Sequence, residues 1–243
     1  MSKIALILGA SSEIGAALIN EIKHEFDIIV AHYNTNRQEL DELRTVIGKD
    51  KLHIIKADFS SKEDTNNFIK TIEETGLIPT HIVHLPAAAV RCINFHKSHW
   101  NCVQTDIDVS LRSIYKILNR FIRPMTKKGN AKIVFVLSSC TVNVPNYMLD
   151  YTVVKYSLLG LMKSLAVEYA EKGININAVS PSMVETKFLN NLPRIIIEKS
   201  RENSPLKRNA NVQDIVPVIK FLLSEESSFI TGQNIVVSGG NKV

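Results

Sequence analysis

Short runs of apolar, often β-branched residues alternate with amphipathic stretches from one end of the 243-residue chain to the other. This pattern is typical of a parallel sheet that is buried on both faces by helices. In the first amphipathic stretch, Ile14, Leu18 and Ile22 recur at helical spacing and indicate a face that packs on the sheet. We expect strands over residues 4–8, 28–33, 52–56, 81–85, 132–137, 174–179 and 234–237. The chain, residues 1–243, therefore predicts one doubly wound α/β domain with a seven-stranded parallel sheet.

The region between the last two predicted strands breaks this alternation. Pro193 and the apolar triplet at residues 195–197 stand among charged residues. We expect an inserted substrate lid at about residues 183–211. Pro217 lies inside the helical pattern of residues 212–223. Because proline lacks the amide that a helix interior uses, we expect a kink or a late helix start there.

Charge and cysteine content exclude several classes of protein. The formal net charge of +5 would permit a nucleic-acid partner, but the basic residues form no stripe with interleaved aromatics. Cys92, Cys102 and Cys140 form no C-x-x-C pair, so we expect reduced thiols and no metal site. The chain has neither a long apolar segment nor a signal-peptide pattern at its start. These features predict a cytoplasmic protein that binds neither nucleic acid nor membrane.

A glycine-containing loop follows the first predicted strand directly and opens into a helix. Gly9 would allow the tight turn, Gly15 would let the helix pack close to the sheet, and Ser11 and Ser12 can cap the helix. The free amides at this helix end would then bind a pyrophosphate. Glu13 stands where this motif usually has glycine, and its carboxylate would repel phosphates unless it points into solvent or forms a capping box. A strand–turn–helix connection without a ligand is the alternative.

The residues after the second and third predicted strands bear on the choice of dinucleotide. No acidic side chain is available there for a free ribose 2′-hydroxyl, whereas Asn34 and Arg37 are polar or basic. NADP(H) is therefore favoured over NAD(H), because Arg37 can attract a 2′-phosphate. Alternatively, Arg37 is only a solvated residue at the start of a helix and contacts no ligand. Asp58 could accept a hydrogen bond from the adenine amino group or cap the helix that begins at Lys62, and both interpretations stay open.

Tyr151 and Lys155 are four residues apart on a predicted helix, so their side chains share one face. A nearby ammonium would lower the pKa of the phenol toward neutrality, and such a tyrosine can exchange a proton with a carbonyl or alcohol oxygen. Ser138 follows the fifth predicted strand and can donate to the same oxygen. If the fifth strand ends one residue later than predicted, Ser139 would take this role instead. Alternatively, either serine could simply cap a helix or a turn.

Taken together, these motifs resemble the short-chain dehydrogenase/reductase family over the whole chain, most closely its 3-oxoacyl-acyl-carrier-protein reductase-like branch. Further matching segments are residues 177–181, Thr186, and residues 230–233 and 236–240. The resemblance implies a Rossmann-type fold, reduction of a ketone to a secondary alcohol by hydride transfer from NADP(H), and a homotetramer. It implies that Lys155 also binds the nicotinamide ribose. The motifs and the resemblance together give this cofactor-binding set: Gly9, Ser11, Ser12, Ile14, Gly15, Asn34, Arg37, Asp58, Phe59, Pro86, Lys155, Pro181, Val184 and Thr186.

Two departures from the family pattern bear on activity. Residues 84–87, His-Leu-Pro-Ala, replace the usual Asn-Asn-Ala-Gly, and Ser110 aligns with the family's catalytic asparagine. The expected catalytic set is Ser138, Tyr151, Lys155 and Ser110. Because Ser138, Tyr151 and Lys155 are all present, we expect an active ketoreductase; the alternative is a catalytically impaired nucleotide-binding regulatory or scaffold protein. Apolar residues at 189–197 suit an acyl chain, a polyketide, a steroid or a neighbouring subunit, so the sequence does not identify the substrate.

Overall fold

The computed structural model describes residues 2–241. In this part of the chain, seven strands form one parallel sheet in the order β3-β2-β1-β4-β5-β6-β7. The strands are β1 (Ile4–Leu8), β2 (Ile28–Tyr33), β3 (Leu52–Lys56), β4 (His81–His84), β5 (Ala131–Val136), β6 (Ile174–Pro181) and β7 (Asn234–Val237). The doubly wound α/β fold predicted from the sequence is confirmed.

All seven predicted strands are present, and β1, β2, β3 and β7 have the predicted bounds. Strand β4 ends one residue early and β5 is displaced by one residue. Strand β6 was predicted too short, because its last two residues, Ser180 and Pro181, interrupt the apolar run. These two residues nevertheless pair with Val236 and Val237 of β7, so the ladder continues past the apolar pattern.

Eight α-helices of seven residues or more flank the strands within residues 2–241. They are α1 (Glu13–Ile22), α2 (Gln38–Ile47), α3 (Lys62–Thr75), α4 (Trp100–Asp106), α5 (Ser113–Thr126), α6 (Leu149–Tyr169), α7 (Arg194–Asn203) and α8 (Val212–Leu223), together with a shorter π-helix, η2 (Ile107–Arg112), that joins α4 to α5 without a break. The 3-10 helices η3 (Ser139–Thr141) and η5 (Lys187–Asn191) lie close to the site described below. None of the helices in residues 2–241 combines the length and the apolar character that a membrane span requires.

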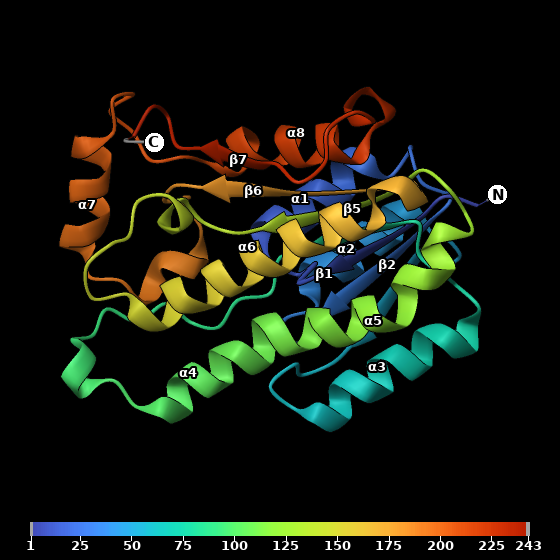
Figure 1. Ribbon diagram of the computed structural model, residues 1–243, viewed down its shortest axis with the longest axis horizontal. Helices are drawn as coiled ribbons and strands as arrows, with labels where there is room; N and C mark the ends of the chain where they lie inside the picture. Colours follow the sequence, from blue (N-terminus) through green and yellow to red (C-terminus); the bar gives the residue numbers. More distant parts are fainter. Residues whose placement is uncertain (1, 242–243) are drawn as a thin grey trace.

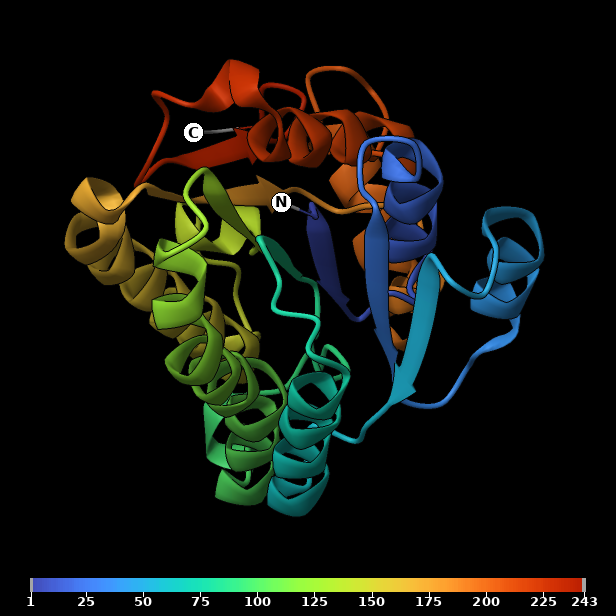
Figure 2. The same cartoon turned by 90° about the vertical axis from the view of Figure 1, so that its right-hand side faces the viewer.

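The helices form one layer on each face of the sheet (Figures 1 and 2). Alternate residues of β1 define the two faces, since Leu6 belongs to one apolar core and Ile7 to the other. The first core contains side chains from α3, α5 and α6, among them Phe68 and Leu158. The second contains side chains from α1, α2 and α8, among them Ile19. The sheet is thus buried on both sides, as its nearly continuous apolar strands require.

The sheet order places β1 between β2 and β4, so the chain changes direction at this point. In open parallel sheets, ligands bind in the crevice outside the carboxyl ends of the strands at such a switch point. Helix α7 lies beyond these carboxyl ends, on the side of the sheet opposite the N-terminus (Figure 1). The fold therefore places the end of β1, the end of β4 and the 183–211 segment around one edge.

The 183–211 segment contains η5 and α7 and is closed at its base by a bridge between Val184 and Ala210. Helix α8 begins directly afterwards at Val212, with a capping box formed by Asn211 and Asp214. The late helix start that we expected from Pro217 is therefore wrong. The capping box fixes the helix start, and Pro217 lies within the helix.

Gly15 permits a close contact between α1 and the end of β1. A Cβ atom on this residue would lie 2.7 Å from the Cα atom of Ala10 and 2.8 Å from the carbonyl oxygen of Gly9, distances that real side chains do not adopt. Gly9 has a φ of 74°, and a Cβ on it would lie 3.2 Å from the nitrogen of Pro86. Both glycines thus have the steric roles that the sequence predicted for them.

Replacing Gly15 with alanine is expected to destabilise the protein by about 1–3 kcal/mol, because the added methyl group forces α1 away from backbone atoms. Gly160 provides a matched control, since it is also helical and a Cβ there would meet nothing within 4 Å. Gly160→Ala is expected to be neutral or stabilising by up to about 1 kcal/mol, the intrinsic helix preference. Urea unfolding of both variants measures the difference. Equal effects of the two substitutions would contradict the packing account.

Candidate functional site

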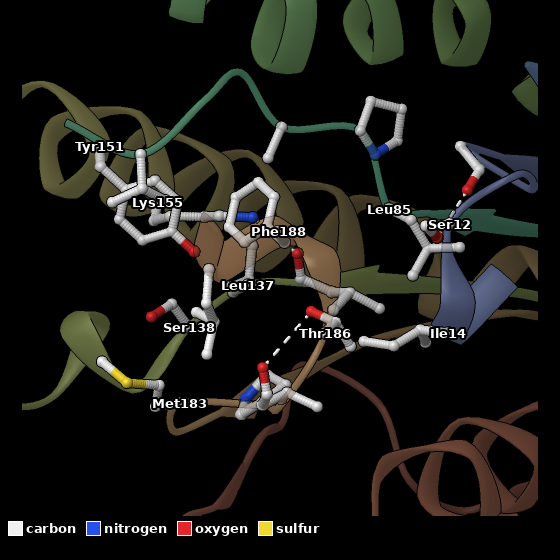
Figure 3. Close-up of a pocket in the computed structure, with 18 of the residues that line it drawn as sticks. Ser12, Ile14, Leu85, Leu137, Ser138, Tyr151, Lys155, Met183, Thr186 and Phe188 are labelled. Atoms are coloured by element: carbon white, nitrogen blue, oxygen red, sulfur yellow. Dashed lines mark hydrogen bonds between the residues drawn. The ribbon is translucent and has the colours of Figure 1, made fainter. Parts of the chain in front are cut away.

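A cavity of about 880 Å³ opens at the carboxyl edge of the sheet. Its wall combines the loop after β1, the ends of β2 to β6, the start of α6 and the 183–211 segment. Figure 3 shows side chains from the start of α1, the ends of β4 and β5, helix α6 and the 183–211 segment directed into a common space. The cavity therefore lies at the edge that the topology indicates, around the switch point between β1 and β4.

Most of the predicted site residues line this cavity. They are Gly9, Ser11, Ser12, Ile14, Asn34, Asp58, Phe59, Pro86, Ser138, Tyr151, Lys155, Pro181, Val184 and Thr186. Three predicted residues do not line it: Gly15 lies beneath the loop, Arg37 lies outside, and Ser110 is buried within η2. Val109, the neighbour of Ser110, reaches the cavity instead.

The loop after β1 forms a capped helix start. The hydroxyl of Ser12 accepts a hydrogen bond from the Gly15 amide at 3.1 Å and donates to the Gly9 carbonyl at 2.8 Å. Glu13 adopts neither of the two arrangements that we expected, since its carboxylate accepts a hydrogen bond from the backbone amide of Lys187 at 2.7 Å. Ser12 already caps the helix, so the Glu13 side chain is free to contact the 183–211 segment.

His32 connects this loop to the neighbouring strand, and sequence reasoning missed its role. Its Nδ1 accepts from the Gly9 amide and its Nε2 donates to the Ala57 carbonyl, both at 3.0 Å. The ring stacks on Phe59 with centroids 3.9 Å apart. Burial lowers the pKa of His32 to about 4, so the ring is neutral at pH 7 and has the tautomer that these two bonds need. The sequence did contain a signal for this role, namely a polar histidine within the otherwise apolar run of β2.

Asp58 remains at the cavity wall but does not cap the following helix. Its Oδ1 accepts hydrogen bonds from the Ser60 amide at 2.9 Å and the Ser60 hydroxyl at 2.8 Å. The cap of α3 is Ser61, whose hydroxyl accepts from the Asp64 amide. Of the two interpretations left open, capping by Asp58 is therefore wrong, and its position at the cavity is compatible with a ligand contact.

The region after β2 differs from the expectation at one residue. Residues 34–36 line the cavity, but Arg37 is exposed and pairs with Asp41 at 2.9 Å. The hydrogen bond from Arg37 to Asp41 raises the pKa of the guanidinium. Glu39, which the sequence did not single out, lines the cavity and lies 3.6 Å from the ammonium of Lys187.

Tyr151, Lys155 and Ser138 come together in the part of the cavity away from Ser12 and Ile14 (Figure 3). The Nζ of Lys155 lies 5.4 Å from the centre of the Tyr151 ring and donates to the Val136 carbonyl at 2.9 Å. Ser138 accepts from the Cys140 amide at 3.2 Å, which fixes its hydroxyl at the end of β5. The predicted serine, rather than Ser139, is thus the one that lies beside Tyr151.

Burial is the main cause of the pKa shifts of Tyr151 and Lys155. It lowers the pKa of Lys155 to about 8 and raises the pKa of Tyr151, while the contact with the Ser138 hydroxyl acts in the opposite direction on Tyr151. We expected Lys155 to lower the pKa of Tyr151; in the protein alone this is wrong. The Lys155 ammonium is bound to the Val136 carbonyl and not to the phenol oxygen, so desolvation of the phenolate prevails.

The first turn of α6, which carries Tyr151, is held by an ion cluster that the sequence did not reveal. Asp150 accepts from the Ser98 hydroxyl at 2.9 Å and lies 3.7 Å from the Arg91 guanidinium. Arg91 also contacts Asp106 of α4 at 2.5 Å. Burial raises the pKa of Asp106, and Arg91 opposes this shift. Since the contacting pairs are 15 to 59 positions apart, their proximity depends on the tertiary fold.

The cavity continues beside Tyr151 into an apolar recess. Val90, Leu189 and Leu192 are buried together, with Met148 and Met183 packed against them. All five line the cavity. A recess of this composition accommodates apolar groups and excludes water from the neighbouring hydroxyls.

Within residues 2–241, no group of three or more histidine, cysteine, aspartate or glutamate side chains has the geometry of a metal site. Cys92 and Cys102 are partly exposed, and Cys140 is buried; all three are free thiols. Burial raises the pKa of the Cys140 thiol, which favours its neutral form. Cys140 is therefore a small packing residue next to Ser138.

A doubly wound sheet with a glycine loop at its switch point, together with a tyrosine–lysine pair in the same cavity, defines an oxidoreductase-type Rossmann protein. A family model described as enoyl-(acyl carrier protein) reductase matches residues 9–242. The chain therefore belongs to the short-chain dehydrogenase/reductase family and is an NAD(P)-dependent enzyme.

Similar proteins extend over the full chain. It is 30% identical over 243 residues to 3-oxoacyl-acyl-carrier-protein reductase FabG of Buchnera aphidicola subsp. Baizongia pistaciae, covering 98% of this chain and 96% of the relative. It is 27% identical over 248 residues to an acetoacetyl-CoA reductase of Allochromatium vinosum, covering 99% and 98%. A solved 4-hydroxyisoleucine dehydrogenase complexed with NADH superposes with a TM-score of 0.89 at 23% identity, covering 99% and 98%, and shows the shared fold.

The depressed pKa of His32 predicts a specific pH dependence of stability. The folded ring titrates at about 4, below its ordinary value of 6.5, so in this interval the unfolded chain binds a proton that the folded chain does not. The contribution of His32 to stability should therefore be fully present above about pH 6.5 and decrease as the pH falls toward 4, by up to about 1.4 kcal/mol for each pH unit. Replacing His32 with asparagine should make the decrease shallower by about one proton in urea unfolding at pH 7, 6 and 5.

His96→Asn is the control, because His96 is exposed. This variant should retain the pH slope of the wild type. A His32→Asn variant with the wild-type slope would show that His32 does not exclude the proton.

Proposed function

We propose that this protein reduces a ketone to a secondary alcohol with NADP(H), and that its substrates are 3-oxoacyl thioesters. The observation that carries the proposal is the convergence of Ser138, Tyr151 and Lys155 in the cavity that also contains the glycine loop. The names of the two full-length bacterial relatives support the substrate class, since 3-oxoacyl-acyl-carrier-protein and acetoacetyl-CoA are both 3-oxoacyl thioesters. The apolar recess around Val90 and Leu189 suits an acyl chain.

The residues at the glycine loop fit a dinucleotide. Side chains at Gly9 or Gly15 would occupy the space between the loop and the backbone of neighbouring segments, so the loop can approach a pyrophosphate closely. The α1 amides and the Ser11 hydroxyl would bind the phosphates, and Asp58 would accept from the adenine amino group. Lys155 and Thr186 would contact the nicotinamide half. When bound, the nicotinamide supplies the hydride that reduces the carbonyl carbon.

The protein groups then handle the carbonyl oxygen. Because the Ser138 hydroxyl accepts from the Cys140 amide, its own proton remains available to hydrogen-bond the substrate oxygen. The raised pKa of Tyr151 keeps the phenol protonated at pH 7, so it can give its proton to the oxygen as the carbon gains the hydride. Lys155 has donors beyond the one bound to Val136, so its ammonium can turn one of them toward the phenolate once the negative charge forms, and the phenolate then regains a proton from solvent.

Replacing Tyr151 with phenylalanine is expected to lower kcat/KM for acetoacetyl-CoA with NADPH by at least about 100-fold, because the proton donor is lost. Oxidation of NADPH, followed by its absorbance, measures the rate, and NADPH fluorescence measures retained binding. Tyr156→Phe is a matched control, because Tyr156 is on the same helix but does not line the cavity; its activity should stay within twofold of the wild type.

Two results would contradict the proposal. A Tyr151→Phe variant as active as the wild type would remove the tyrosine from the mechanism. A wild-type protein that binds NADPH but is inert toward 3-oxoacyl thioesters would favour the nucleotide-binding regulatory or scaffold alternative.

The preference for NADP(H) is proposed from the residues that follow β2. Residues 34–36, Asn-Thr-Asn, line the cavity without a carboxylate, and the negative charge of Glu39 is paired with Lys187. Arg37 is outside the cavity, but its ion pair with Asp41 is between exposed side chains. Such a pair is weak, so Arg37 can exchange Asp41 for a 2′-phosphate at little cost.

Replacing Arg37 with glutamine is expected to raise the Kd of NADPH about fivefold to tenfold, which is about 1–1.4 kcal/mol, and to change the Kd of NADH less than twofold. Fluorescence titration with each dinucleotide measures the two constants. Arg123→Gln on α5, away from the cavity, is the control. An equal change for both dinucleotides would mean that Arg37 does not recognise the 2′-phosphate.

Three expectations about organisation, assembly and location remain. We propose that the 183–211 segment acts as the substrate lid of one domain spanning residues 1–243, because its residues line the cavity beside Tyr151. The homotetramer implied by the family resemblance and the cytoplasmic location stay predictions.

A further inference from the structure

Glu13 has an unusual place for a carboxylate. It is the first residue of α1, at a position of the glycine loop where the family pattern has glycine, and it lines the cavity. The positive end of a helix stabilises a negative side chain, but a pyrophosphate bound to the same amides would be repelled by it. A role beyond the glycine loop itself is therefore needed to account for this residue.

The Glu13 carboxylate reaches across the mouth of the cavity. It accepts a hydrogen bond from the backbone amide of Lys187, 174 positions away, at 2.7 Å. Lys187 is the first residue of η5 and follows Thr186, one of the expected nicotinamide contacts. The first turn of η5 is thereby fastened to the start of α1.

A second link reaches the same residue from α2. The ammonium of Lys187 lies 3.6 Å from Glu39, so the backbone of this residue is held by α1 and its side chain by α2. The two links differ in strength. The Lys187 side chain is 73% exposed, and such ion pairs contribute little, whereas a hydrogen bond from an amide to a carboxylate is charge-assisted. Glu13 should therefore account for most of the attachment.

The two ends of the 183–211 segment are held to each other independently of Glu13. The Glu185 amide donates to the Ala210 carbonyl at 2.8 Å, and the Ala210 amide donates to the Met183 carbonyl at 3.0 Å. With its base held in this way, the segment can open by separating η5 from α1. Glu13 contacts the segment at Lys187, two residues after Glu185 of this base, and such an opening would break this contact.

We propose that Glu13 is a positioning residue that fastens the first turn of η5 across the cavity and thereby slows the exchange of the dinucleotide. Glutamate at this position would repel the phosphates to some extent, but it also holds η5, which follows Thr186, against α1. The effect on the dinucleotide rests on the proposed function, but the attachment itself is a property of the protein alone.

Hydrogen exchange tests the attachment without any ligand. The peptide containing the Lys187 amide should exchange about tenfold faster in Glu13→Ala than in the wild type, because the acceptor is lost. Glu13→Gln should stay within threefold of the wild type, since its amide oxygen still accepts from Lys187. Glu39→Gln, which removes the weaker link, should also have a small effect, and peptides of α5 serve as the internal reference. Unchanged exchange in Glu13→Ala would overturn the proposal.

Dissociation of NADPH, followed by its fluorescence after mixing with excess NADP⁺, tests the consequence. The rate should increase about tenfold in Glu13→Ala and stay close to the wild-type rate in Glu13→Gln. Equal changes in the two variants would assign the effect to the lost charge and overturn the proposal, as would an unchanged rate in Glu13→Ala. If the wild type binds no NADPH, the proposed function fails, and hydrogen exchange still decides whether Glu13 fastens η5.

Discussion

The close approach of α1 to the end of β1 is the contact on which the cavity depends. Gly15 lies against the backbone of residues 9 and 10, where no side chain could be accommodated. This contact directs the amides at the start of α1 toward the crevice, and the hydrogen bond from the Gly9 amide to His32 fixes the loop relative to β2. A loop positioned by strand ends and buried rings has little freedom, so a ligand bound there needs little reorganisation.

Burial at the carboxyl edge sets the charge state of the groups around the cavity. His32 and His84 are neutral because the pKa of each is lowered, to about 4 and about 3, and Tyr151 is neutral because its pKa is raised. In all three cases desolvation is the largest cause, so the packing that stabilises the sheet also determines which groups hold protons. A protonated phenol is the form required for donation to a carbonyl oxygen. Burial keeps Tyr151 in this form, but the raised pKa also makes the phenol a weaker acid, so proton donation depends on a cation close to the phenolate that forms.

The sequence predicted the elements well because each is specified locally. Apolar strands buried on both sides have a clear signature, and the requirement for glycine at positions 9 and 15 follows from one tight connection. Strand ends were less reliable, since Ser180 and Pro181 extend β6 by pairing with β7 rather than by their own apolar character. At the site, the lysine–tyrosine spacing was informative, but the direction in which Lys155 donates depends on the Val136 carbonyl at the end of β5. The ion cluster of Arg91, Asp106 and Asp150 could not be anticipated, because the fold brings together three separate segments.

Glu13 illustrates how a departure from a motif acquires meaning only in the tertiary structure. In the sequence alone, a carboxylate among phosphate-binding amides is unfavourable. Solvent exposure or capping of the helix are the local arrangements that would reduce its repulsion of the phosphates. Ser12 already caps α1, and the tertiary fold offers the Lys187 amide as a partner. The substitution therefore places an acceptor on one wall of the cavity opposite a donor on the 183–211 segment. Because the same segment carries Thr186 and the apolar side chain of Leu189, a change at the glycine loop can affect both ends of the site.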